Sequence, residues 1–181
     1  MKQTLGYKLP DLIMMVGPSG AGKSKIANEI GYPIVSTDKI RLNLFGILEG
    51  KIDPEAYTRD GFWKTFSAAE QIVKTYLKYG QSVIYDATNL TGHDRMTFLL
   101  SMGFFEAETP TQADVYYYVV DRPLEEKLES YKLAMCFKDG VPHTSEEIIT
   151  RHHEKMRQNV EFLMSNRDTD KIKITIKDFR S

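Results

Sequence analysis

A glycine-rich run that ends in a lysine and a serine carries the strongest chemical signal in the sequence. It reads Gly17-Pro18-Ser19-Gly20-Ala21-Gly22-Lys23-Ser24, matches the pattern G-x-x-x-x-G-K-[ST], and lies between an apolar run and a helical pattern. Its glycines let backbone N–H groups approach a pyrophosphate, and the positive end of the following helix faces the same anion. Lys23 would then reach the β- and γ-phosphates, and Ser24 would hold Mg²⁺. We call this run the phosphate loop. It predicts an ATP site in which all eight residues bind the nucleotide.

A carboxylate and a guanidinium follow the next apolar run. Asp38 and Arg41 stand three positions apart, just after Pro33 to Ser36. The end of a strand is where ligands bind in open α/β sheets, and a helix starting at Asp38 would put both side chains on one face. The carboxylate could then take a hydroxyl proton while the arginine holds a neighbouring phosphate. The alternative is that Asp38 only caps a helix and Arg41 is a surface charge.

A third polar segment, Asp86-Ala87-Thr88-Asn89, ends another apolar run. We expect it at the same edge of the sheet, so that three strand ends converge on one cleft. Asp86 has two possible roles, on the acceptor side of this cleft or as a carboxylate that holds the metal through water together with Ser24. Asp121, which closes a further apolar run, could also serve the metal, and its position favours it less than Asp86.

The remaining pattern supplies the elements that must position these residues. Five short apolar runs alternate mostly with longer helical patterns, which indicates a parallel sheet with helical crossovers. The predicted strands are 12–16, 33–36, 82–86, 113–120 and 173–176. The predicted helices are 23–30, 38–45, 54–79, 93–102, 124–135 and 145–164.

Several motifs together resemble a known family. The phosphate loop, Asp38-Lys39-Ile40-Arg41, Asp86-Ala87-Thr88-Asn89 and the downstream Arg95 are similar to the 5′-hydroxyl polynucleotide kinases of phages and bacterial RNA-repair systems. The similarity extends from Leu12 to about Met164. It implies an α/β P-loop kinase fold, a three-layer sandwich whose five-stranded parallel sheet has the order 2-3-1-4-5, with a helical lid.

The same resemblance implies roles for individual residues. The aspartate matching Asp38 is the general base in that family, and the arginine matching Arg41 contacts the phosphate next to the acceptor hydroxyl. Asp86, Thr88, Asn89 and Arg95 are then expected on the acceptor side, with Lys23, Asp38 and Arg41 as catalytic residues and ATP and Mg²⁺ as cofactors.

The lid expected at residues 127–144 departs from the family. The relatives carry arginines there that engage the donor phosphates, whereas Ser130 to Lys138 contains none. We expect Lys132 and Lys138 to substitute at the ATP, although lysine lacks the planar fork of arginine. Arg151 or Arg157 could help from the next helix.

Composition restricts the class of protein. With 181 residues, 41% hydrophobic and 27% charged, the chain is expected to form one soluble domain, spanning 1–181 and located in the cytoplasm, with no membrane segment. The single cysteine, Cys136, excludes an internal disulfide, and we expect it to pack in the interior. A net charge of −1 leaves nucleic acid neither favoured nor excluded as a partner.

The expected activity is transfer of the ATP γ-phosphate to a hydroxyl of a nucleic acid, most simply a 5′ end. Lysines and arginines available near the acceptor side are Lys39, Arg41, Lys51, Arg59, Lys64 and Arg95. Alternatives are a kinase for another hydroxyl, such as a modified base, nucleoside, sugar or antibiotic, and a regulatory module that binds ATP without transfer. Oligomeric state is not predicted.

Other aromatic and histidine residues are given structural roles. We expect Tyr116, Tyr117 and Tyr118 to pack in a strand and Phe62, Trp63 and Phe66 to pack in the core. His143, His152 and His153 match no familiar metal spacing and are expected to be solvated.

Overall fold

The computed structural model describes residues 8–45, 59–108, 110–136, 145–165, 169 and 171–181. Its strands are β1 (Asp11–Val16), β2 (Ile34–Ser36), β3 (Val83–Asp86), β4 (Asp114–Val119) and β5 (Ile174–Asp178). Its helices are α1 (Lys23–Ile30), α2 (Thr37–Phe45), α3 (Arg59–Lys78), α4 (Gly92–Ser101), α5 (Leu124–Cys136) and α6 (Glu146–Met164). Each predicted strand and helix is found, with ends that differ by one or two residues where both are described. The first residues expected in the third helix, 54–58, lie outside the described part.

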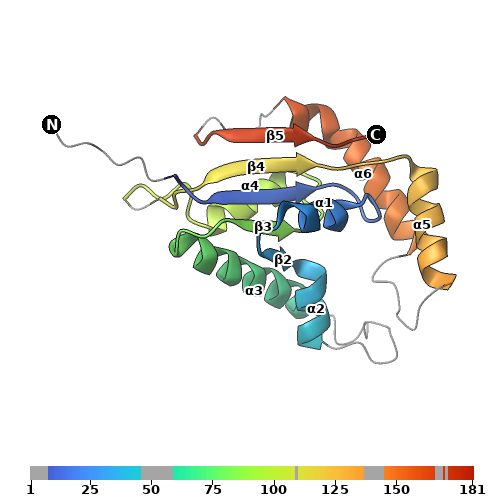
Figure 1. Ribbon diagram of the computed structural model, residues 1–181, viewed down its shortest axis with the longest axis horizontal. Helices are drawn as coiled ribbons and strands as arrows, with labels where there is room; N and C mark the ends of the chain where they lie inside the picture. Colours follow the sequence, from blue (N-terminus) through green and yellow to red (C-terminus); the bar gives the residue numbers. More distant parts are fainter. Residues whose placement is uncertain (1–7, 46–58, 109, 137–144, 166–168, 170) are drawn as a thin grey trace.

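The five strands form one parallel sheet in the order β2-β3-β1-β4-β5, as predicted (Figure 1). β1 is central, with Ile13 opposite Ile84 of β3 and opposite Tyr116 of β4. Because all strands run the same way, their carboxyl ends meet at one edge, and α5 lies beyond that edge. The loops that follow β1, β2, β3 and β4 are therefore brought together there.

The larger half of the core lies on one face of the sheet. Alternate residues of the central strands, including Met14, Tyr85 and Tyr117, point to this face and are almost completely buried. They pack against α3, α4 and α6, and the Tyr85 ring stacks on Phe98 with centroids 3.9 Å apart. Met156 of α6 belongs to this cluster, so α6 is fixed to the sheet by its apolar side.

A smaller cluster covers the opposite face. Ile13, Met15 and Ile84 pack there against Ala27 of α1. Figure 1 shows α1 crossing this face directly after the loop that follows β1. The sheet thus lies between two helical layers, which confirms the predicted three-layer arrangement and fixes the start of α1 at the carboxyl edge.

Local signals determine where the helices begin. Ser145 caps α6 by accepting a hydrogen bond from the Ile148 N–H, and Glu146 and Glu147 occupy the first turn, as their favourable interaction with the helix dipole predicts. Thr91 and Asp94 form a capping box at α4, so this helix starts one residue earlier than predicted.

Packing predictions for the aromatic residues were correct for the strand and wrong for part of α3. Tyr117 and Tyr118 are buried. Phe62 and Trp63, however, are 43% and 58% exposed, because the side of α3 that packs on the sheet carries Thr65, Ala69 and Val73 instead. The side chain of Cys136 lies outside the described part, so its packing stays a prediction. Among the described residues, no helix is long and apolar enough to cross a membrane.

Candidate active site

The phosphate loop is held tightly at its first residue. A Cβ atom on Gly17 would lie 2.0 Å from the Val120 carbonyl oxygen, so only glycine fits between the end of β1 and the end of β4. The Gly17 N–H donates to the Thr88 carbonyl oxygen at 2.9 Å, which ties the loop to the segment after β3 as well. Gly22 adopts a left-handed conformation, with φ of 95°, and begins α1. The loop is therefore shaped by both neighbouring strands.

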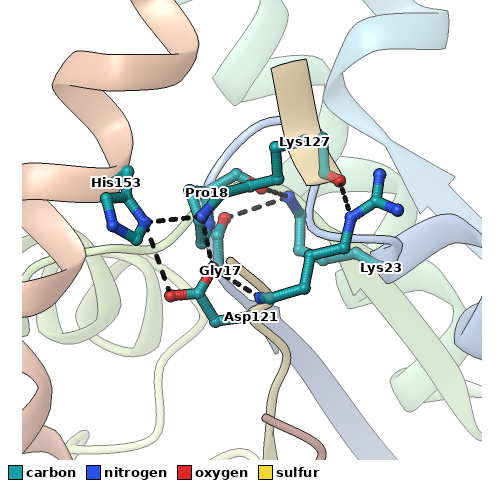
Figure 2. Close-up of polar contacts among 8 residues, drawn as sticks. Gly17, Pro18, Lys23, Asp121, Lys127 and His153 are labelled. Carbon is teal, nitrogen blue, oxygen red and sulfur yellow. Dashed lines mark hydrogen bonds and ion pairs between the residues drawn. The ribbon is translucent and has the colours of Figure 1, made fainter. Parts of the chain in front are cut away.

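Lys23 folds back over this loop. Its Nζ donates to the carbonyl oxygens of Gly17 and Pro18, both at 2.9 Å (Figure 2). Burial lowers the pKa of the ammonium group, while the carboxylates of Asp86, Asp38 and Asp121 oppose that shift. The ammonium group is thus positioned at the loop where a phosphate would be bound, and its partners are carbonyl groups rather than a carboxylate.

A hydroxyl and a carboxylate meet next to Lys23. The Ser24 Oγ donates to Asp86 Oδ2 at 3.1 Å, and Asp86 is only 8% exposed. Burial raises the pKa of Asp86, against the lowering effects of Lys23 and the Ser24 hydrogen bond. A hydroxyl and a carboxylate are oxygen ligands of the kind that Mg²⁺ prefers, so these two residues fit that ion.

Asp121, the alternative carboxylate, has other partners. Its Oδ1 accepts hydrogen bonds from Lys127 Nζ at 2.6 Å and from the Arg122 N–H at 2.9 Å. Lys127 is completely buried, and its Nζ also lies 2.7 Å from Nδ1 of His153 (Figure 2). Asp121 therefore neutralises a buried lysine, and of the two carboxylates it is Asp86 that contacts Ser24.

Asp38 and Arg41 lie on one face at the start of α2, as their spacing predicts. Arg41 Nη1 is 2.7 Å from Asp38 Oδ1, and the carboxylate is the exposed partner, with 60% of its side chain accessible against 16% for arginine. Asp38 also acts on the pKa values of Lys23 and Asp86 through its charge. These three side chains therefore lie within electrostatic range of one another at the carboxyl edge of the sheet.

Two residues that we expected to bind the acceptor are buried and hold the loop after β3. Arg95 is 0% exposed; its Nη1 donates to the Asn89 carbonyl oxygen at 2.9 Å and its guanidinium lies over the Tyr117 ring. Asn89 is 5% exposed, adopts a φ of 48°, and donates from Nδ2 to the Met15 carbonyl oxygen. Both side chains are thus buried by other parts of the chain, and their predicted part in acceptor binding stays a prediction. They fix the loop after β3 against β1, and Thr88, which is half-buried, stays at the surface between them.

The predicted lid is described only in part. Lys132 is on the exposed side of α5, where its Nζ lies 3.8 Å from the Glu146 carboxylate. Lys138 and residues 137–144 lie outside the described part. Arg151 and Arg157 are exposed on α6. The contribution of all four side chains to ATP binding stays a prediction.

Sequence reasoning missed contacts that α5, α6 and the β4–α5 loop make around the phosphate loop. His152 Nδ1 lies 3.0 Å from the Ser19 Oγ, His153 contacts Lys127, and Arg122 Nε donates to the Gly20 carbonyl oxygen. Neither histidine is fully solvated, so the expectation for this pair was wrong. Helical spacing could have predicted this, because the two histidines lie midway between the apolar residues Ile149 and Met156, on the buried side of the helix.

The parallel sheet order and the glycine-rich loop together define a P-loop kinase fold. The sequence profile of the AAA_33 family, described as an AAA domain, matches residues 12–127, and the chain belongs to this family. No curated protein matches the chain in sequence.

Solved structures agree with this fold assignment. A chain in a structure described as the Pnkp1/Rnl/Hen1 RNA repair complex is 21% identical, with a TM-score of 0.68 over 90% of this chain and 49% of that one. A chain of the PezAT chromosomal toxin-antitoxin system from Streptococcus pneumoniae is 18% identical, with a TM-score of 0.62 over 95% and 70%. Shikimate kinase from Acinetobacter baumannii, solved with shikimate, is 16% identical, with a TM-score of 0.50 over 93% and 83%. This chain thus spans about half the length of its RNA-repair neighbour and most of the length of the small-molecule kinase.

Proposed function

We propose that this protein transfers the γ-phosphate of ATP to a hydroxyl group at the 5′ end of a nucleic acid. The observation that carries the proposal is the exposed Asp38 carboxylate, hydrogen-bonded to Arg41 and within electrostatic range of Lys23 and Asp86. A phosphate cradle and a candidate base for the acceptor thus lie at one edge of the sheet.

The donor half of the site would be formed by the phosphate loop. Its backbone N–H groups and the start of α1 would hold the phosphates, and Lys23 would exchange its bonds to the Gly17 and Pro18 carbonyls for bonds to phosphate oxygens. Ser24 and Asp86 would hold Mg²⁺, which supplies positive charge to the β- and γ-phosphate oxygens when it is bound.

The acceptor half would be formed by α2. Asp38 would accept the proton of the attacking hydroxyl while the hydroxyl oxygen bonds to the γ-phosphorus. The bond between that phosphorus and the β–γ bridging oxygen would break, which releases ADP. Arg41 would hold Asp38 in position and could contact a phosphate adjacent to the hydroxyl.

Three considerations favour a nucleic acid as acceptor over a small metabolite. The four motifs of this chain resemble those of polynucleotide kinases, and the RNA-repair chain has the higher TM-score of the two kinase-like neighbours described above, 0.68 against 0.50. A free 5′ end also offers a hydroxyl beside a phosphodiester, which suits the pairing of a carboxylate with an arginine. A kinase for a small hydroxyl compound is the second candidate, since the chain matches shikimate kinase over most of its length.

The test is phosphoryl transfer from γ-labelled ATP, with Mg²⁺, to matched DNA and RNA oligonucleotides that carry either a 5′-hydroxyl or a 5′-phosphate. Nucleosides, sugars and shikimate complete the panel. We expect label on the 5′-hydroxyl oligonucleotides alone. Transfer only to a small molecule would replace the proposed acceptor, and ATP binding without transfer to any compound would favour a regulatory module.

Asp38→Asn tests the base itself. We expect kcat to fall by roughly 10²–10⁴, with ATP affinity changed less than about twofold, because the carboxylate acts on the acceptor proton. Asp114→Asn is the matched control, since Asp114 is an exposed carboxylate at the first residue of β4, on the opposite edge of the sheet. Equal activities of the two variants would contradict a catalytic role for Asp38.

A further inference from the structure

Helix α6 contributes a side chain directly to the phosphate loop. His152 Nδ1 lies 3.0 Å from the Ser19 Oγ, although the two residues are separated by 133 positions in the sequence. His152 is half-buried, so the residue keeps some exposed surface. This contact places an imidazole at the third residue of the predicted phosphate cradle.

The position of His152 is fixed by its neighbour. Lys127 Nζ can only donate, so the Nδ1 atom of His153 accepts its hydrogen bond of 2.7 Å. Lys127 is in turn paired with Asp121 at the end of β4 (Figure 2). Together with the packing of Met156 in the core, these contacts attach α6 to the sheet just after His152, which restricts where the ring can lie before any ligand binds.

The charges around His152 indicate which end of a bound nucleotide it would face. Both Lys23 and Asp38 are close enough to act on its pKa, together with Arg151 and Lys155 on its own helix. Lys23 is expected at the β- and γ-phosphates, and Asp38 must lie near the γ-phosphate if it activates the attacking hydroxyl. Because the imidazole lies within electrostatic range of both side chains, the γ-phosphate end of the cradle is the part of a bound nucleotide that it would face.

The His152 ring can also donate a hydrogen bond to a phosphate oxygen. Burial, followed by the positive charges of Arg151, Lys23 and Lys155, lowers the pKa of His152 to about 4, so the ring is neutral at pH 7. A neutral imidazole has one donor and one acceptor nitrogen. If the Ser19 hydroxyl donates to Nδ1, the proton lies on Nε2, and that N–H is available to a phosphate oxygen.

We propose that His152 is a further catalytic residue, which donates a hydrogen bond from Nε2 to the γ-phosphoryl group of the bound nucleotide. This role supplies a donor from α6 to a site whose predicted lid has no arginine between Lys127 and Lys138. The inference rests on the ATP site of the proposed function and does not depend on the identity of the acceptor.

The test compares the affinities of Mg²⁺–AMP-PNP, which has a γ-phosphoryl group, and Mg²⁺–ADP, which lacks one, by isothermal titration calorimetry of the full chain. We expect His152→Ala to weaken AMP-PNP binding about tenfold or more and ADP binding less than about twofold, the loss expected for one hydrogen bond to a charged group. His93→Ala is the matched control, since His93 is exposed on α4. Equal losses for both ligands would identify a structural role through Ser19 and overturn the inference, as would no loss for either.

Two further variants separate the ring nitrogens and keep the test usable if the alanine variant does not fold. Gln can place an amide N–H near the position of Nε2, whereas Asn reaches only the position of Nδ1. We expect His152→Gln to retain the preference for AMP-PNP over ADP, and His152→Asn to lose it. The reverse order would overturn the inference.

The results for the unchanged protein separate this inference from the proposed function. Binding of AMP-PNP with loss on His152 substitution, but no transfer to any nucleic acid, would leave this inference intact and reject the proposed acceptor. Failure of the unchanged protein to bind either nucleotide would overturn both.

Discussion

The Ser24 hydroxyl donates a hydrogen bond of 3.1 Å to the Asp86 carboxylate, which joins the start of α1 to the end of β3. If these oxygens hold Mg²⁺, Asp86→Asn should raise the Mg²⁺ concentration for half-maximal transfer by about 10–100-fold, because the ion loses a charged partner. Asp121→Asn, assayed at a temperature at which the variant is fully folded, serves as the comparison and should leave that concentration nearly unchanged. A Mg²⁺ titration of initial rates measures both, and a larger shift for the Asp121 variant would assign the metal to the end of β4 instead.

Lys127 and Asp121 form an ion pair beside the loop, with Nζ 2.6 Å from Oδ1 and the lysine completely buried. Asp121→Asn should destabilise the protein by about 3–5 kcal/mol, because it leaves a completely buried ammonium group without a counter-charge. Lys132→Ala, which removes an exposed ion pair of 3.8 Å with Glu146, should cost less than about 1 kcal/mol. Urea unfolding gives the free energy of unfolding of each variant. Similar losses for the two variants would show that the buried Lys127 does not need the charge of Asp121.

Two glycine substitutions distinguish a steric requirement from a conformational one. Gly17→Ala places a Cβ atom 2.0 Å from the Val120 carbonyl oxygen and should cost at least about 3 kcal/mol, because β1 and β4 cannot separate without breaking the sheet. Gly31→Ala meets no atom within 4 Å and only loses its preferred positive φ, so about 1–2 kcal/mol is expected. Thermal and urea unfolding should rank the two variants in this order. A smaller loss of stability for Gly17→Ala than for Gly31→Ala would mean that the ends of β1 and β4 can move apart to admit a side chain.

The pKa of His152 predicts a pH dependence of stability. The ring has a pKa of about 4 when folded and about 6.5 when unfolded, so the unfolded chain binds the additional proton between these values. Its contribution to stability is therefore complete above pH 6.5 and is lost as the pH falls from about 6.5 to about 4. The full shift corresponds to about 3 kcal/mol, which solvent screening of a half-buried ring reduces to about 1–2 kcal/mol.

Urea unfolding at pH 7.5 and pH 5 measures this dependence, with His152→Gln and His93→Gln compared. The His152 variant should lose less stability between the two pH values than the unchanged protein, and the His93 variant should behave like the unchanged protein. An identical pH dependence in all three proteins would contradict the lowered pKa.

Features encoded by neighbouring residues could be predicted from the sequence. The phosphate loop, the five apolar runs and the helix start at Ser145 are signals of a few consecutive residues, and the structure reproduces them. The placement of Asp38 beside Arg41 follows from helical spacing alone. The parallel order of the strands follows from the resemblance to P-loop kinases.

Side chains whose surroundings come from distant segments could not be predicted. Arg95 is an ordinary basic residue in a helix pattern, and its burial depends on Tyr117 and Asn89, which reach it from other elements. Lys127 is buried only because Asp121 and His153 converge on it. Charge and spacing along one helix do not reveal such partners, so the sequence placed Arg95 on the acceptor side and Lys127 at the start of the lid.

The central position of β1 also determines when the nucleotide site can form during synthesis. Its partners are β3 and β4, and the Gly17 turn needs the backbone at Val120, more than a hundred residues later. At about 5–20 residues per second, a ribosome adds that length in roughly 5–20 s. Throughout this interval the apolar segment Leu12–Val16 has no complete sheet to join and is exposed to aggregation or chaperone binding. We therefore expect the nucleotide site to form only after β4 has emerged.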